Sequence, residues 1–60
     1  MKTILLLEDL PEIRAWLRLL LLQVFPSAQI SEAARVSDAM SLIQAIQFDL
    51  AMVDLGLPDG

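Results

Sequence analysis

Apolar and polar residues follow one another along the chain in a pattern that predicts five consecutive elements. Residues 4–7 and 50–53 are short continuous apolar runs, and residues 28–33 include a short alternating stretch. Such short runs favour strands, and continuous apolar runs are typical of strands buried on both faces of a parallel sheet. Residues 11–25 and 37–47 carry apolar side chains at helical spacing, which predicts two helices.

The ends of the expected helices carry local signals. Pro11 is tolerated in a first turn, Glu12 is favoured there by the helix dipole, and Pro26 ends the helix. Ser37 and Asp38 offer a cap for the second helix. The faces expected to be buried consist of Ile13, Leu17, Leu20, Leu21 and Val24 in the first helix and Ala39, Leu42, Ile43 and Ile46 in the second.

The rest of the first helix is expected to be mixed. Arg14 and Arg18 should lie on the side opposite the buried face, and Trp16 should be partly buried by helix packing. Leu19 and Leu22 point away from the expected face, so they predict apolar surface that needs a partner.

Alternation of strands and helices predicts an α/β fold, in which a parallel sheet is covered by helices on both faces. No linker, repeat or low-complexity segment interrupts the pattern, so residues 1–60 are expected to form one unit. If the strand order is 2-1-3, it reverses between the first and third strands. Parallel α/β sheets bind ligands at such a point, outside the carboxyl ends of the strands.

Acidic residues stand at that point. Glu8 and Asp9 directly follow the first run, and Asp54 follows the last. Three like charges in one crevice need a cation, and an all-oxygen set suits Mg²⁺. Two plainer interpretations stay open, because Asp9 could cap the next helix and Asp54 could be a turn residue. Asp38 is interpreted only as a helix cap, and Asp49 only as a turn residue.

The composition limits the kinds of functional site that the chain can form. The chain has no Cys and no His, and its four basic and eight acidic residues give a net charge of −4. This excludes thiolate and imidazole sites and disfavours a nucleic-acid surface, which needs basic patches. The apolar runs are too short for a membrane span or a secretory signal, so the cytoplasm is expected. The hydrophobic fraction is nevertheless 57%, above the roughly 45–50% of ordinary domains.

Two segments resemble the receiver domains of two-component response regulators: Ile-Leu-Leu-Leu-Glu-Asp at 4–9 and Leu-Ala-Met-Val-Asp-Leu-Gly-Leu-Pro-Asp-Gly at 50–60. The resemblance covers the whole chain, which spans about half of such a domain. It implies the βαβαβ half of a doubly wound, flavodoxin-like parallel sheet with strand order 2-1-3. The expected unit is therefore a truncated receiver domain.

The resemblance also implies roles. Asp54 matches the phosphoacceptor, which takes a phosphoryl group from a histidine kinase or phosphotransfer protein. Asp9 matches the direct Mg²⁺ ligand, Glu8 the acid that often acts through water, and Gly56 the residue whose backbone carbonyl completes the metal shell. The family's Ser or Thr and its Lys would lie beyond residue 60, so impaired phosphorylation is expected. Lys2 is expected at the wrong end of the sheet to replace the missing Lys.

A signalling module rather than a turnover enzyme is thus expected. A rival interpretation is an inactive half-domain that assembles through an exposed sheet edge. A phosphatase of the haloacid dehalogenase type is rejected, because Gly56 stands where its second Asp is needed. The apolar excess and an open third strand predict a homo-oligomer with sheet order 2-1-3-3′-1′-2′, or one formed by exchanging an element.

Overall fold

A computed structural model of the chain describes residues 2–54, and the expected loop at 55–60, with Gly56, lies outside the described residues. The elements are β1 (Thr3–Glu8), α1 (Pro11–Val24), β2 (Gln29–Ala33), α2 (Val36–Ala45) and β3 (Leu50–Asp54). All five expected elements are present, with ends shifted by no more than two residues. The largest shift is at the end of α2.

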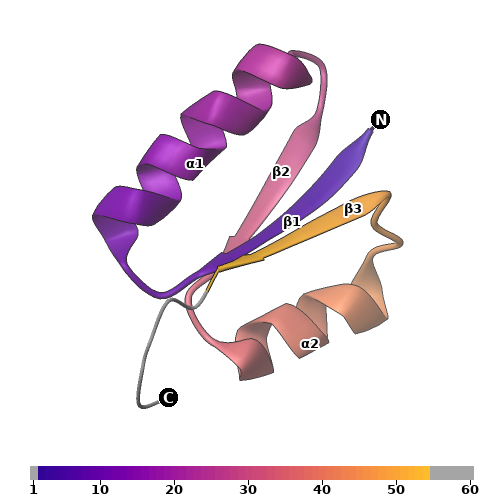
Figure 1. Cartoon of the computed structure of the whole chain (residues 1–60). Helices are drawn as coiled ribbons and strands as arrows, with labels where there is room; N and C mark the ends of the chain where they lie inside the picture. Colours follow the sequence, from indigo (N-terminus) through magenta and orange to yellow (C-terminus); the bar gives the residue numbers. More distant parts are fainter. Residues whose placement is uncertain (1, 55–60) are drawn as a thin grey trace.

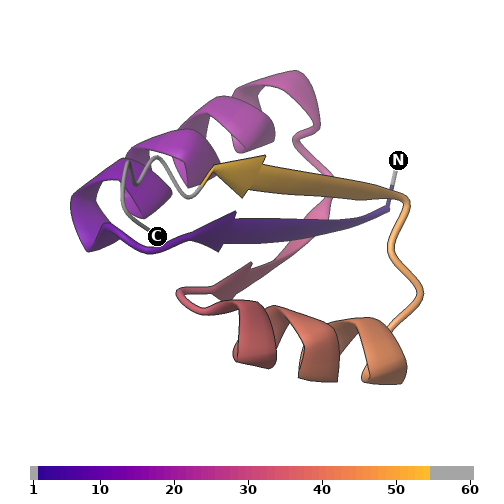
Figure 2. The ribbon, with the colours of Figure 1, turned by 60° about the horizontal axis from the view of Figure 1, so that its bottom comes forward.

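The three strands form one parallel sheet in the order β2-β1-β3, which confirms the predicted α/β fold and strand order. Helix α1 covers one face of the sheet and α2 the other (Figures 1 and 2). No helix in the described part of the chain combines the length and apolar character needed to cross a bilayer.

The central strand β1 supplies both halves of the core, because its successive side chains point to opposite faces. Ile4 and Leu6 pack with Leu17 and Leu21 beneath α1. On the other face, Leu5 and Leu7 form a cluster with Ala33 and Ala39 beneath α2, with Leu42 and Phe48 packed against it. Residues 4–7 are therefore buried on both faces, as their continuous apolar run predicted. The burial predicted from the run at 50–53 was wrong, because β3 lies at an edge of the sheet and none of its residues is fully buried.

Helix α1 is rotated about its axis relative to the expected orientation. Only Leu17 and Leu21 of the predicted face are buried, whereas Ile13 is 39% exposed and Val24 68% exposed. Trp16 is exposed, at 57%, so the prediction that helix packing partly buries it was wrong. The rotation goes together with the contacts that Arg14 and Arg18 make with Glu32. Leu19 and Leu22 were expected to point away from the buried face. Leu19 is exposed as expected, whereas Leu22 is half-buried.

Arg14 explains the rotation, because it lies against the sheet and not on the opposite side. Its Nη1 donates a hydrogen bond to the Glu8 carbonyl at 2.9 Å. Its Nε donates to Oε1 of Glu32 on β2 at 3.2 Å. Arg18 Nε lies 3.3 Å from the second oxygen of Glu32. The prediction that both arginines lie opposite the sheet was therefore wrong.

Helix α2 begins one residue earlier than expected, at Val36. Arg35 is the N-cap residue, and no side chain caps the helix, so the predicted Ser37–Asp38 cap was wrong. Asp38 instead lies in the first turn, where a negative charge is favourable to the helix dipole. Ala39 is buried as predicted, but Ile43 is 50% exposed.

Asp49 joins the starts of β1 and β3. Its Oδ2 accepts hydrogen bonds from the backbone N–H groups of Lys2 at 2.9 Å and Thr3 at 3.0 Å. Thr3 Oγ1 donates to the Gln47 carbonyl at 2.9 Å. The hydrogen bonds from Lys2 and Thr3 hold the pKa of the Asp49 carboxyl below its usual range. Asp49 is therefore a structural link between strands rather than a simple turn residue.

Candidate functional site

The carboxyl ends of β1 and β3 bring two of the predicted site residues together. Glu8 and Asp54 are register partners in the parallel pairing of these strands. Partner residues in adjacent parallel strands project their side chains to the same face of the sheet. The strand order predicted from the sequence therefore produces the expected acidic edge, with Asp9 next along the chain.

Glu8 is the buried member of this edge, with 2% of its surface exposed. Its Oε2 accepts a hydrogen bond from the Leu10 backbone N–H at 3.0 Å. That hydrogen bond lowers the pKa of the Glu8 carboxyl, but burial, the Asp9 carboxyl and the charge of Asp54 together raise the pKa above its usual range. Among the described residues, the ion pairs of Arg14 and Arg18 are both with Glu32, and Glu8 forms none.

Asp9 does not cap α1, which overturns the plainer interpretation of this residue. The N-cap position belongs to Leu10, and no side chain caps the helix. The side chain of Glu8, not that of Asp9, accepts a hydrogen bond from the Leu10 N–H. Within the described residues, Oδ1 of Asp9 is buried without a hydrogen-bond partner. An unpartnered buried carboxylate oxygen is costly, so this atom is suited to a ligand that the protein itself does not supply.

Asp54 ends β3 and its side chain is exposed, in contrast to Glu8. Lys2 and Thr3 lie at the opposite end of the sheet, where the strands start, as expected for Lys2. Among the described residues, Asp54 therefore has neither of these side chains beside it.

The acidic edge fits a cation in part. Over residues 2–54 no three acidic side chains are arranged closely enough to hold a metal ion, so the predicted ligands share an edge without converging on one point. The unpartnered Oδ1 of Asp9 and the buried carboxyl of Glu8, whose pKa is raised, both lie at this edge. Gly56, the fourth predicted ligand, lies outside the described residues.

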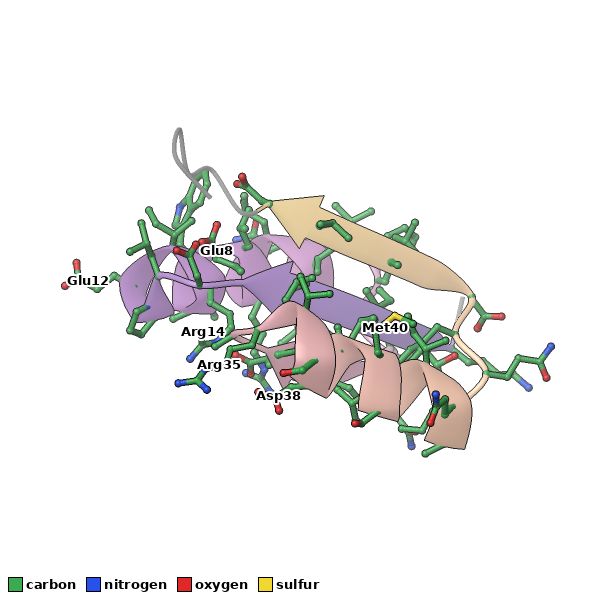
Figure 3. All side chains as sticks on the ribbon, turned by 90° about the horizontal axis from the view of Figure 1, so that it is seen from below. Glu8, Glu12, Arg14, Arg35, Asp38 and Met40 are labelled. Carbon is green, nitrogen blue, oxygen red and sulfur yellow. The ribbon has the colours of Figure 1, made fainter. Side chains whose placement is uncertain are left out.

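An apolar hollow next to this edge was missed by the sequence interpretation. It has a volume of about 300 Å³ and is lined by Leu10, Pro11, Glu12 and Ile13. The hollow lies at the start of α1, immediately after Asp9, and Figure 3 shows Glu8 and Glu12 near that end of the helix. The sequence signal that could have indicated this hollow is Leu10, a large apolar residue between Asp9 and Pro11.

Neither a protein-family model, nor a curated protein, nor a solved structure matches this chain.

Proposed function

We propose that this chain is a phosphoacceptor receiver module of a two-component signalling system. Asp54 takes a phosphoryl group from a histidine kinase or phosphotransfer protein in the cytoplasm. The pairing of Glu8 with Asp54 at one strand edge carries the proposal, since it joins the exposed acid to a buried one. The unpartnered oxygen of Asp9 at the same edge supports a role for Mg²⁺.

The proposed chemistry is a transfer between two side chains. A carboxylate oxygen of Asp54 forms a bond to phosphorus, the phosphorus–nitrogen bond of the partner's phosphohistidine breaks, and the imidazole leaves with the bonding electrons and takes up a proton. When bound, Mg²⁺ would neutralise charge on the phosphoryl oxygens. Asp9, Asp54 and the Gly56 carbonyl would hold the ion directly, and Glu8 would act through water.

Exposure and burial divide the roles of the acids. Asp54 is accessible to a partner, whereas buried Glu8 and the hydrogen bond from the Leu10 N–H hold the turn before α1 in place. Lys2 is too far from Asp54 to stabilise a phosphorylated product within the same chain.

Incubation with acetyl phosphate and Mg²⁺, followed by peptide mass spectrometry, tests the proposal. We expect a phosphoryl group on Asp54, and none after Asp54→Asn. Asp38→Asn is the matched control, because Asp38 is an exposed acid in α2, outside the acidic edge. Modification that persists in Asp54→Asn, or no modification of the parent chain, would overturn the proposal.

A second candidate function is assembly without phosphotransfer. It is favoured by the arrangement of β3, which pairs only with β1 among the described strands and carries the exposed side chain of Val53. This candidate predicts a homo-oligomer that is never modified on Asp54. The mass-spectrometric experiment therefore separates the two functions.

A further inference from the structure

The two outer edges of the sheet differ in chemistry. The β2 edge is polar, with Gln29, Ser31 and Glu32, and Glu32 is held by two arginines of α1. The β3 edge has four consecutive uncharged residues, 50–53, before Asp54. It has neither Lys nor Pro, the residues that commonly protect edge strands from pairing with another chain. The β3 edge is therefore the one open to a further strand.

Exposed apolar side chains of α1 flank that edge. Arg14 and Arg18 contact Glu32 and so mark the side of α1 that faces β2. Helical spacing places an apolar stripe on the other side, toward β3. The stripe consists of Ile13, Trp16, Leu20 and Val24, all of them between 38% and 68% exposed.

A second stripe flanks the same edge on the opposite face of the sheet. It consists of Val36, Met40 and Ile43 of α2, each at least half exposed. Figure 3 shows Met40 on the side of α2 toward β3, whereas Arg35 and Asp38 lie on the other side. Val53 of β3 is 60% exposed, and its register partner Leu7 packs beneath α2. Exposed apolar surface thus borders the open strand on both faces.

We propose that a second copy of this chain pairs with β3 in the antiparallel direction. A prime marks the second copy, and the joined sheet has the order β2-β1-β3-β3′-β1′-β2′. An isologous contact of this kind closes on itself and leaves both polar β2 edges outermost. The pairing does not depend on whether Asp54 accepts a phosphoryl group.

Charge decides the direction of the pairing. Parallel pairing about a two-fold axis would place the acidic ends of both chains, each with Glu8, Asp9 and Asp54, side by side. Antiparallel pairing centred on Met52 separates the two Asp54 residues by about 14 Å along the strands, at about 3.4 Å per residue. It places each acidic end beside the strand starts of the other copy, where the charges of Lys2 and Asp49 balance.

Antiparallel pairing also keeps both α1 helices on one face of the joined sheet. Helices centred over β1 and β1′ would lie three strand spacings, or about 14 Å, apart. A helix with its side chains is about 10–12 Å wide, so Trp16 and its counterpart can close most of the remaining gap. The two stripes would then shield the seam between β3 and β3′ from water.

Sedimentation of the 60-residue chain over a wide concentration range tests the proposal. We expect a reversible monomer–dimer equilibrium. Val53→Lys should weaken it by about tenfold or more, because the interface would have to bury a charge without a partner. Gln29→Lys is the matched control, since it adds the same charge to an exposed position of the β2 edge and should leave the equilibrium unchanged. Circular dichroism establishes that both variants fold.

Amide hydrogen exchange on the parent chain gives a second measurement that needs no variant. Residues 50–54 should gain protection as concentration rises, and residues 29–33 should not. A chain that stays monomeric at all concentrations would overturn the proposal. A dimer that Val53→Lys leaves intact, or protection gained along β2 instead of β3, would overturn it as well.

Discussion

Arg14 donates a hydrogen bond to the Glu8 backbone carbonyl at 2.9 Å, so the first turns of α1 hold the acidic turn in place. The same side chain reaches Glu32 of β2. One arginine therefore joins the end of β1, the start of α1 and the neighbouring strand. Because its side chain is only 22% exposed, these contacts are better shielded from water than ordinary surface pairs.

Arg14→Ala is expected to destabilise the fold by about 1–2 kcal/mol, because it removes charge-assisted hydrogen bonds to the Glu8 carbonyl and Glu32. The measurement is a urea unfolding curve. Arg18→Ala serves as the control, since Arg18 is 47% exposed and contacts only Glu32, and should cost no more than about 0.5 kcal/mol. Equal effects of the two substitutions would contradict the role assigned to Arg14.

Glu8→Gln is expected to stabilise the metal-free protein at neutral pH. The folded-state pKa of Glu8 is raised above 4.5, so the folded state binds the proton more tightly than the unfolded state does. Stability is therefore lost as pH rises above 4.5 and Glu8 ionises in the folded protein. A Gln side chain can still accept the Leu10 hydrogen bond without this charge.

Urea midpoints measured across that pH range check the expectation for Glu8. The parent chain should lose stability toward neutral pH, and Glu8→Gln should lose less. Glu12→Gln is the control, since Glu12 is an exposed acid of the first turn of α1. A lower midpoint for Glu8→Gln than for the parent at neutral pH would contradict the assigned pKa shift.

Millimolar Mg²⁺ is expected to bind weakly at the acidic edge and to perturb the backbone amides nearest Asp9. Asp9→Asn should reduce the response, because it removes the charge beside the unpartnered Oδ1. Asp54→Asn should reduce it too, because one of the acids at this edge is lost. Amide chemical shifts during a Mg²⁺ titration measure the response, with Asp38→Asn as the control. The absence of any shift near Asp9 would rule out the site.

The strand order and the meeting of Glu8 with Asp54 could be predicted from the sequence. Continuous apolar runs are typical of strands in a parallel sheet, and the carboxyl ends of parallel strands meet at one edge. The runs did not distinguish the buried central strand β1 from the edge strand β3. The rotation of α1 could not be predicted, because it depends on the pairing of Arg14 with Glu32, which lies 18 positions away. Local helical periodicity carries no information about such a contact.

The behaviour of the acids at the start of α1 was predicted only in part. An Asp before a helix is a common N-cap, which made Asp9 a reasonable capping residue. The structure instead turns the Glu8 side chain back to the Leu10 N–H, and Asp9 keeps an unpartnered oxygen. Leu10 is the N-cap residue, so Asp9 lies one position before the place from which a side chain could cap the helix.

Asp49→Asn is expected to make the fold less stable at neutral pH but not in acid. The Asp49 carboxylate accepts hydrogen bonds from the N–H groups of Lys2 and Thr3, and its folded-state pKa is lowered from 3.8. A lowered pKa means that this stabilisation is present above pH 3.8 and is lost as pH falls through the folded-state value. Urea midpoints of parent and variant should therefore differ at neutral pH and converge in acid. Asp38→Asn, which alters an exposed acid without hydrogen bonds to β1, should change the acid dependence of the parent less than Asp49→Asn does. A gap between parent and Asp49→Asn that persists at the lowest pH would show that the side chain acts through its shape rather than its charge.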